Sequence, residues 1–307
     1  MDPVGERLRA RGTMVGLVVG NALGVGVEGM TAAAIASERG DRIGEIPASE
    51  MDAPWDDDVA QAVLLAEAAL ERGTMELEDL AARFLAWYRE SGRGIGLLTA
   101  QVLGALDRGA DPRDAAREIW ESSGRTSAGN GAVMRCAPLA LRWWRDLDRL
   151  TRETLRSAAV THADPRCGWS AVLLNRGLAA VLADAAPDLE GLAQEAQQGA
   201  GEHGAEIADA VLAAGDTERP ADLSLDGPDM GYTLKTMQVG LWALVRARDL
   251  EASLIGVIEA GGDTDTNGAV AGAALGCRDG LEAIPPRWLE RAPGRDRALE
   301  LADALIG

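Results

Sequence analysis

Two acidic clusters, far apart in the sequence, have the residue types of a site for a hard metal ion. The first is Gly261-Gly262-Asp263-Thr264-Asp265-Thr266 and the second is Trp55-Asp56-Asp57-Asp58. Each leads at once into an apolar segment, which predicts a turn followed by a buried helix. Carboxylates packed this closely repel one another unless a cation lies between them, and oxygen ligands suit Mg²⁺, Mn²⁺ or Ca²⁺. The alternative is that both clusters are solvated helix starts, where free N–H groups favour acidic residues.

A polar, glycine-rich stretch at residues 122–135 is a candidate phosphate-binding loop. It contains Gly129-Asn130-Gly131 and runs into Met134 and Arg135. Glycines and small hydroxyls allow backbone N–H groups to approach a phosphate closely. A plain connection is the alternative, although a long loop of this composition inside a helical domain is usually functional.

The elements that must position these residues are all predicted helices. Apolar residues recur at helical spacing, and no segment shows the alternation of a half-buried strand. An apolar segment at 6–36 carries a glycine at every fourth position from 12 to 24, which favours close packing against another helix. Polar connections are expected at 37–54 and 216–230. The other helices are expected at residues 56–71, 76–90, 95–107, 111–121, 151–160, 167–185, 189–198, 205–214, 231–247, 250–260, 267–277 and 296–306. The predicted fold is therefore all-α, with one compact multi-helix domain over residues 1–307.

Composition narrows the function classes. The chain has 307 residues and a net charge of −19, from 49 acidic and 30 basic residues. Such a surface repels nucleic acids and anionic membranes, so neither is an expected partner. Three cysteines at irregular spacing suggest buried free thiols rather than disulfides or a zinc site. The polar start without a signal-peptide pattern, and the lack of about 18 consecutive apolar residues, favour the cytoplasm.

Four segments, in order along the chain, resemble the ADP-ribosylglycohydrolase family, which includes the dinitrogenase-reductase-activating glycohydrolases. Two looser matches, Thr161-His162 followed by Pro165 and Gly231-Tyr232 leading to Leu241-Trp242, support them, and together they span almost the whole chain. The four are Gly20-Asn21-Ala22-Leu23-Gly24 with Glu28; Trp55-Asp56-Asp57-Asp58; Gly129-Asn130-Gly131-Ala132-Val133-Met134-Arg135 with Pro138; and Gly261-Gly262-Asp263-Thr264-Asp265-Thr266.

The resemblance implies an all-α fold with two Mg²⁺ ions, or Mn²⁺, between the two acidic clusters. The implied metal ligands are Asp56, Asp57, Asp58, Asp263, Asp265 and Thr266. Asp56 stands where relatives usually carry a threonine ligand, so the resemblance leaves open whether it binds the metal directly.

Substrate residues are implied by the same matches. Gly129, Asn130, Gly131 and Met134 correspond to the loop that holds the diphosphate, and His162 to a residue that lines the ADP-ribose pocket. Taken without the resemblance, a lone histidine is more often structural. The catalytic candidates are Asp57, Asp58 and Glu28, which matches an acid near the metals. The general base is expected to be Asp57, Asp58 or Asp56, and the sequence does not choose among them.

Besides Asp56, three positions depart from the family pattern. Asn21 replaces an aspartate, Val59 replaces the second threonine of Thr-Asp-Asp-Thr, and Gly94 replaces the aspartate of Asp-Ile-Gly. That last aspartate is associated with cleavage of ADP-ribosyl-arginine, so its absence argues against an arginine linkage.

The expected function is magnesium-dependent hydrolysis of the glycosidic bond of an ADP-ribose conjugate, with a metal-activated water. The acceptor would be an ADP-ribosylated protein or a small molecule. Two alternatives remain at this point: a metal-containing binder of ADP-ribose or a nucleotide without catalysis, and a hydrolase of another ribosyl glycoside.

Overall fold

The computed structural model describes residues 3–38 and 43–307, and its secondary structure there is helical, which confirms the all-α prediction. Two isolated β-bridges, Thr31 with Gly261 and Gly129 with Tyr232, are the only extended pairing in these ranges. The helices of the first half are α1 Pro3–Gly24, α2 Ala32–Glu38, α3 Ala48–Met51, α4 Asp57–Arg72, α5 Leu77–Glu90, α6 Leu97–Asp107, α7 Ala115–Ser122, α8 Gly131–Met134 and α9 Ala137–Trp143.

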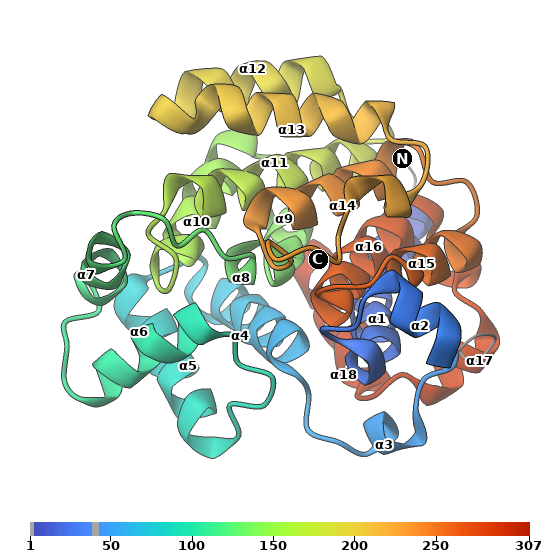
Figure 1. Ribbon diagram of the computed structural model, residues 1–307, viewed down its shortest axis with the longest axis horizontal. Coiled ribbons are helices and arrows are strands. Elements are labelled where there is room, and N and C mark those ends of the chain that lie inside the picture. Colours follow the sequence, from blue (N-terminus) through green and yellow to red (C-terminus); the bar gives the residue numbers. More distant parts are fainter. Residues whose placement is uncertain (1–2, 39–42) are drawn as a thin grey trace.

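The second half continues the same pattern (Figure 1). Its helices are α10 Leu147–Ala159, α11 Pro165–Leu182, α12 Leu189–Gly199, α13 Gly204–Asp216, α14 Thr233–Val245, α15 Leu250–Glu259, α16 Thr264–Asp279, α17 Pro286–Arg291 and α18 Arg295–Ile306. Short 3₁₀ turns, η1 Val25–Val27, η3 Gly201–His203, η4 Pro220–Leu223 and η5 Leu281–Ala283, complete the described elements.

A glycine seam joins α1 to α16 in antiparallel fashion. A Cβ on Gly20 would lie 1.9 Å from the Gly268 carbonyl oxygen, and one on Gly16 would lie 2.1 Å from the Gly272 oxygen. Only glycine permits backbones to approach so closely. The predicted role of the four-residue glycine spacing is thus confirmed. The seam brings the end of α1 against the start of α16, which carries Asp265 of the acidic cluster at residues 261–266.

The segment Val4–Val27, which spans α1 and η1, is long and apolar enough by composition to cross a membrane. Most of its apolar window is nevertheless buried inside the protein, where Met14, Val15, Val18 and Val19 belong to the main core. Its apolar character is therefore accounted for by packing within the fold.

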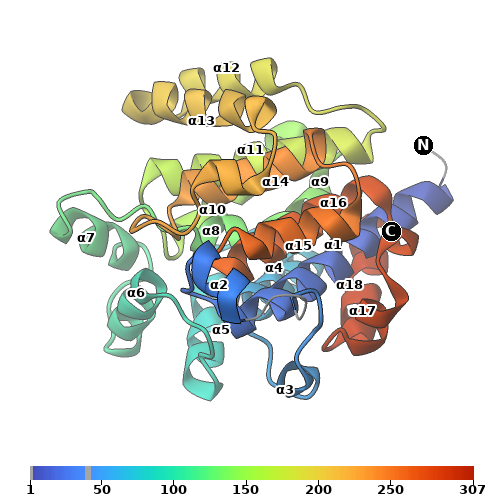
Figure 2. The ribbon, with the colours of Figure 1, turned by 45° about the vertical axis from the view of Figure 1, so that its right-hand side comes forward.

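Helices α12 and α13 form an outer layer over α11 and α14, at the top of Figures 1 and 2. A second, smaller core lies beneath them, built from residues such as Leu192, Ile207, Val211 and Met237. The acidic clusters lie on the other side of α11 and α14, so this layer supports the fold and does not line the candidate site.

Several boundaries differ from the sequence predictions. The connection expected at 37–54 holds the one-turn helix α3, and its residues 39–42 lie outside the described ranges. The loop expected at 122–135 ends in α8, and α9 follows it unpredicted; both are buried on nearly every side, so they lack the one-sided apolar pattern of a surface helix. Asp111-Pro112 forms a turn, and α7 begins only at Ala115.

Candidate metal and substrate site

The two acidic clusters meet in space, as the family resemblance implies. Carboxylate oxygens of Asp56, Asp58 and Asp265 all lie within 4.8 Å of one another, and the three side chains are buried. Asp56 caps the N-terminus of α4, Asp58 lies in its first turn, and Asp265 lies in the first turn of α16. The two helix starts therefore aim their acids at one point.

Burial makes this cluster unfavourable in its ionised form. Burial raises the pKa of Asp58 well above its usual range, and the neighbouring carboxylates of Asp57 and Asp56 raise it further. The pKa values of Asp57 and Asp265 are raised for the same two reasons, burial first and adjacent acids second. Such a group of acids is stable near neutral pH only with protons or a cation among them.

The donor set fits a hard divalent cation. Asp58 Oδ1 and Asp265 Oδ1 are buried without a hydrogen-bond partner, although buried carboxylate oxygens are normally paired. Oxygen atoms with unused lone pairs in a cage of carboxylates are the ligands that Mg²⁺ and Mn²⁺ prefer. Thr266 follows Asp265 in the chain and lies on the cavity wall with it, so its hydroxyl is a further oxygen donor beside the cage.

Amide side chains surround the acids and orient them. Asn21 Nδ2 donates to Asp58 Oδ2 at 3.3 Å. Asn130 Nδ2 donates to Asp263 Oδ2 at 2.8 Å. The asparagine at position 21 thus supplies a donor to the cluster where the family's usual aspartate would add another negative charge.

A cavity of about 580 Å³ opens beside the cluster. Asp57, Asp263, Asp265 and Thr266 line it, whereas Asp56 and Asp58 lie behind its wall. Every residue predicted to bind substrate lies on the same cavity: Gly129, Asn130, Gly131, Met134 and His162. Glu28 also lines it, and its pKa is raised by burial and by the neighbouring Asp263 and Asp56 carboxylates.

Backbone hydrogen bonds clamp the loops around this cavity. The Asn130 N–H donates to the Gly231 carbonyl at 3.0 Å, which fixes the glycine-rich loop against the segment before α14. The Gly29 N–H donates to the Gly262 carbonyl, and the Gly262 N–H donates to the Met30 carbonyl, both at 2.8 Å. These last two hydrogen bonds hold the segment that contains Glu28 beside the acidic turn that contains Asp263.

Comparison with known proteins agrees with this geometry. The family model described as ADP-ribosylglycohydrolase matches residues 3–307. The chain is 26% identical to the ADP-ribosyl-[dinitrogen reductase] glycohydrolase of Rhodospirillum rubrum, over 92% of this chain and 90% of that protein. It is 26% identical to the ADP-ribosylarginine hydrolase Tri1 of Pseudomonas putida, over 97% of this chain and 78% of that protein.

A solved structure titled ADP-ribosylglycohydrolase-related protein complex shares the fold. It matches with a TM-score of 0.77 and 32% sequence identity, over 99% of this chain and 98% of that chain. This chain belongs to the ADP-ribosylglycohydrolase family. It is therefore an enzyme of the class that hydrolyses the glycosidic bonds of ADP-ribose conjugates.

Sequence reasoning missed part of the wall of this glycohydrolase cavity. Gly231 enters the sequence analysis only through a looser family match, and Gly96 follows the departure at Gly94. Both lie at turns that precede a helix, which is the one signal that could mark them. Ser123 and Ser127 on the wall belong to the predicted loop at 122–135, whereas Thr99, Gln101 and Met230 carry no sequence signal.

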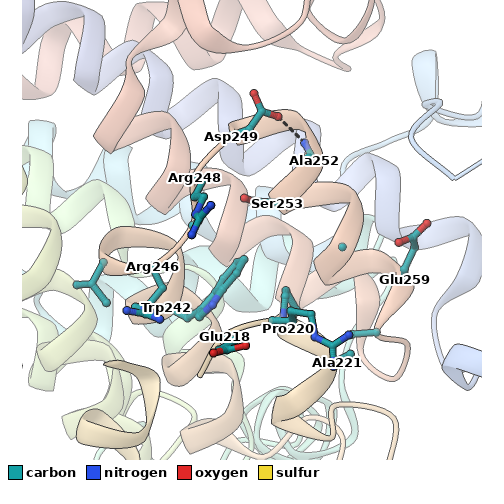
Figure 3. Close-up of a pocket in the computed structure, with 15 residues that line it drawn as sticks. Glu218, Pro220, Ala221, Trp242, Arg246, Arg248, Asp249, Ala252, Ser253 and Glu259 are labelled. Atoms are coloured by element: carbon teal, nitrogen blue, oxygen red, sulfur yellow. Dashed lines mark hydrogen bonds between the residues drawn. The ribbon is translucent and has the colours of Figure 1, made fainter. Parts of the chain in front are cut away.

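A second cavity, of about 720 Å³, lies between the end of α14, η4 and α15 (Figure 3). Its acids Glu218, Asp249 and Glu259 are exposed and do not form a buried cluster. None of the predicted site residues lines it. The glycohydrolase chemistry is therefore assigned to the cavity beside Asp265.

Proposed function

We propose that the protein is a divalent-cation-dependent hydrolase that releases ADP-ribose from a protein or small-molecule acceptor. The observation that carries the proposal is the opening of a buried aspartate cluster into a cavity that also contains the predicted diphosphate loop. Asp56, Asp57, Asp58, Asp263, Asp265 and Thr266 would hold the metal, proposed as two Mg²⁺ ions with Mn²⁺ as a substitute. When bound, such a cation offsets the charge of the acids and lowers the pKa of a water molecule.

The remaining chemistry belongs to the chain's own residues. A glycosidic bond at the ribose breaks through an oxocarbenium-like state, so the ribose must be oriented and the attacking water must lose a proton. Asp57 would accept that proton, a role supported by its position on the cavity wall. Gly129 and Gly131 have no side chains that would block the approach of a diphosphate to the backbone, the Asn130 side chain is held on Asp263, and Glu28 closes the cavity on the acidic side.

The acceptor is proposed to be oxygen-linked rather than arginine. A guanidinium leaving group would call for a carboxylate partner outside the metal cluster. Position 94, where relatives carry that acid, is glycine, and its neighbours on the wall, Gly96, Leu97 and Leu98, are uncharged.

The test measures release of free ADP-ribose from arginine-linked, serine-linked and O-acetyl-ADP-ribose substrates, with Mg²⁺ and with EDTA. EDTA-sensitive release from an oxygen-linked substrate is expected, and Asp265→Ala should abolish it. Retained turnover in Asp265→Ala or Asp263→Ala would refute the metal assignment. Binding of ADP-ribose without release from any substrate would instead indicate a non-catalytic binder.

A further inference from the structure

A chain of three buried side chains ends at the cavity wall. Arg135 Nη2 donates to Thr161 Oγ1 at 2.7 Å, and Thr161 Oγ1 lies 2.8 Å from His162 Nδ1. Arg135 and Thr161 have no exposed surface, and His162 is 3% exposed. His162 lies on the cavity wall beside Gly129 and Gly131. The direction of the hydrogen bonds in this chain decides which imidazole nitrogen carries the proton.

Donor and acceptor chemistry gives that direction. A guanidinium group has only donors, so Thr161 Oγ1 must accept from Arg135. The threonine hydroxyl then has one proton to donate, and within the described structure His162 Nδ1 is the acceptor in reach. If Nδ1 carried the proton, the hydroxyl hydrogen would be buried without a partner, which proteins avoid. Nδ1 therefore accepts, and the proton of the neutral ring is on Nε2.

The guanidinium at the start of the chain is held in place from several sides. It stacks on the Phe84 ring at 4.6 Å, donates to Gln61 Oε1, and donates to the Ser157 carbonyl at 3.2 Å. Because these contacts fix the guanidinium, Arg135 keeps one lone pair of Thr161 Oγ1 occupied, and the hydroxyl proton of Thr161 is left to donate to His162.

The far edge of the imidazole is left open by the glycine-rich loop. A Cβ on Gly131 would lie 2.6 Å from His162 Cε1 and 2.9 Å from Nε2, and one on Gly129 would lie 3.5 Å from Nε2. Among the described residues, His162 Nε2 has no hydrogen-bond partner. Burial and the charge of Arg135 lower the pKa of His162 to about 3, so the ring stays neutral near neutral pH.

We propose that Arg135 and Thr161 fix His162 as its Nε2–H tautomer, so that it presents one oriented N–H donor to an acceptor oxygen of the substrate. Arg135 and Thr161 are then positioning residues, and His162 is the binding residue. The identity of the ligand rests on the proposed function. In ADP-ribose both the phosphate and the ribose oxygens are acceptors of this kind.

The tautomer can be read by nitrogen NMR of protein labelled only at histidine. The chain has two histidines, so His203→Gln assigns both rings. Native protein should show His162 neutral with the proton on Nε2. Thr161→Val, which keeps the shape and removes the hydroxyl, should shift the ring toward the Nδ1–H form, whereas Thr161→Ser should keep the native pattern. An Nδ1–H or charged His162 in native protein, or an unchanged spectrum in Thr161→Val, overturns the proposal.

Calorimetry with ADP-ribose, ADP and ribose 5-phosphate tests the donor role. Thr161→Val should weaken ADP-ribose binding about tenfold, while Thr161→Ser binds nearly as native protein does. A shift of the Nε2 signal with both ADP and ribose 5-phosphate indicates the phosphate that these two fragments of ADP-ribose share, and a shift with ribose 5-phosphate but not ADP indicates the ribose at the cleaved end. Equal binding by native and Thr161→Val protein overturns the donor role. Lack of ADP-ribose binding by native protein would refute the proposed ligand, while the NMR result still decides the tautomer.

Discussion

The Asp56 carboxylate, a member of the buried cluster, lies where a side chain on Gly94 would begin. A Cβ on Gly94 would lie 1.6 Å from Asp56 Oδ1 and 3.1 Å from Asp57 Oδ1, and Gly94 has a φ of +75°. Both residues depart from the family pattern, which usually has threonine at position 56 and aspartate at position 94. The structure connects them, because the glycine leaves room for the extra carboxylate.

Gly94→Ala should therefore disturb the site. The added Cβ must displace the Asp56 carboxyl group, and the positive φ adds backbone strain of about 1 kcal/mol. We expect a loss of about 2–3 kcal/mol in the free energy of unfolding and weaker Mg²⁺ binding, measured by denaturant unfolding and calorimetry.

Gly96→Ala is the matched control for this substitution. Gly96 has a φ of −65° and no atom within 4 Å of its Cβ position, so its alanine variant should bind Mg²⁺ as native protein does. In Asp56→Ala/Gly94→Ala the clash is removed, and the two losses should not add. Additive losses would show that the residues are not coupled.

Cation removal should change how stability depends on pH. The raised pKa values of Asp57, Asp58 and Asp265 mean that the folded protein holds more protons than the unfolded chain above about pH 4. The free energy of unfolding of cation-free protein should then fall as pH rises. Saturating Mg²⁺ should offset this fall, by about 2.7 kcal/mol at a hundred times its dissociation constant.

The measurement is denaturant unfolding over a pH series, with EDTA and with Mg²⁺. Asp58→Asn should be less destabilised by high pH and should lose most of the Mg²⁺-dependent gain, because the isosteric amide carries no charge. Coincident unfolding curves with EDTA and with Mg²⁺ would argue against a cation in this cluster.

Much of the site was predictable from sequence because acids at helix starts are local signals. The local signal marks Asp56, Asp58 and Asp265 as acids that open buried helices, whereas their grouping into one metal site came from the family resemblance, because spacing alone does not show that two distant segments meet. The contact between Gly94 and Asp56 could not be predicted, because it joins two loops whose relative position depends on tertiary packing. Helix α9 was missed for a related reason: it is buried on nearly all sides, so its sequence lacks the one-sided periodicity on which helix prediction relies.

The glycine seam should be intolerant of a single methyl group. In Gly20→Ala the new Cβ would lie 1.9 Å from a backbone oxygen of α16, so the two helices must separate. We expect a loss of about 3 kcal/mol or more in the free energy of unfolding, with reduced Mg²⁺ affinity because α16 carries Asp265.

Gly256→Ala tests the same change where there is room. Gly256 lies inside α15, and the nearest atom to its Cβ position is Pro220 Cγ at 3.9 Å. Alanine there should stabilise the protein by about 0.5–1 kcal/mol through helix propensity. If Gly20→Ala also failed to lower the free energy of unfolding, α1 and α16 could not lie as close together as they do in this structure.

His162 should make the protein sensitive to mild acid. Its pKa is lowered to about 3 by burial and by Arg135, whereas in the unfolded chain it is about 6.5. The folded state therefore binds fewer protons, so stability is full above about pH 6.5 and is lost as the pH falls toward 3. At about pH 5 this loss is about 2 kcal/mol.

His162→Gln has no such titration. At neutral pH it should be less stable than native protein, because it does not reproduce the hydrogen bond between Thr161 and the ring. The difference in unfolding free energy should then narrow as the pH is lowered toward 5, in a series of denaturant titrations. His203→Gln, at the start of α13 and away from the cavity, is the control and should run parallel to native protein. A constant difference between native and His162→Gln protein across the series would mean that His162 has the same pKa in the folded protein as in the unfolded chain. The fold would then not hold the ring neutral at about pH 5, and the prediction would be wrong.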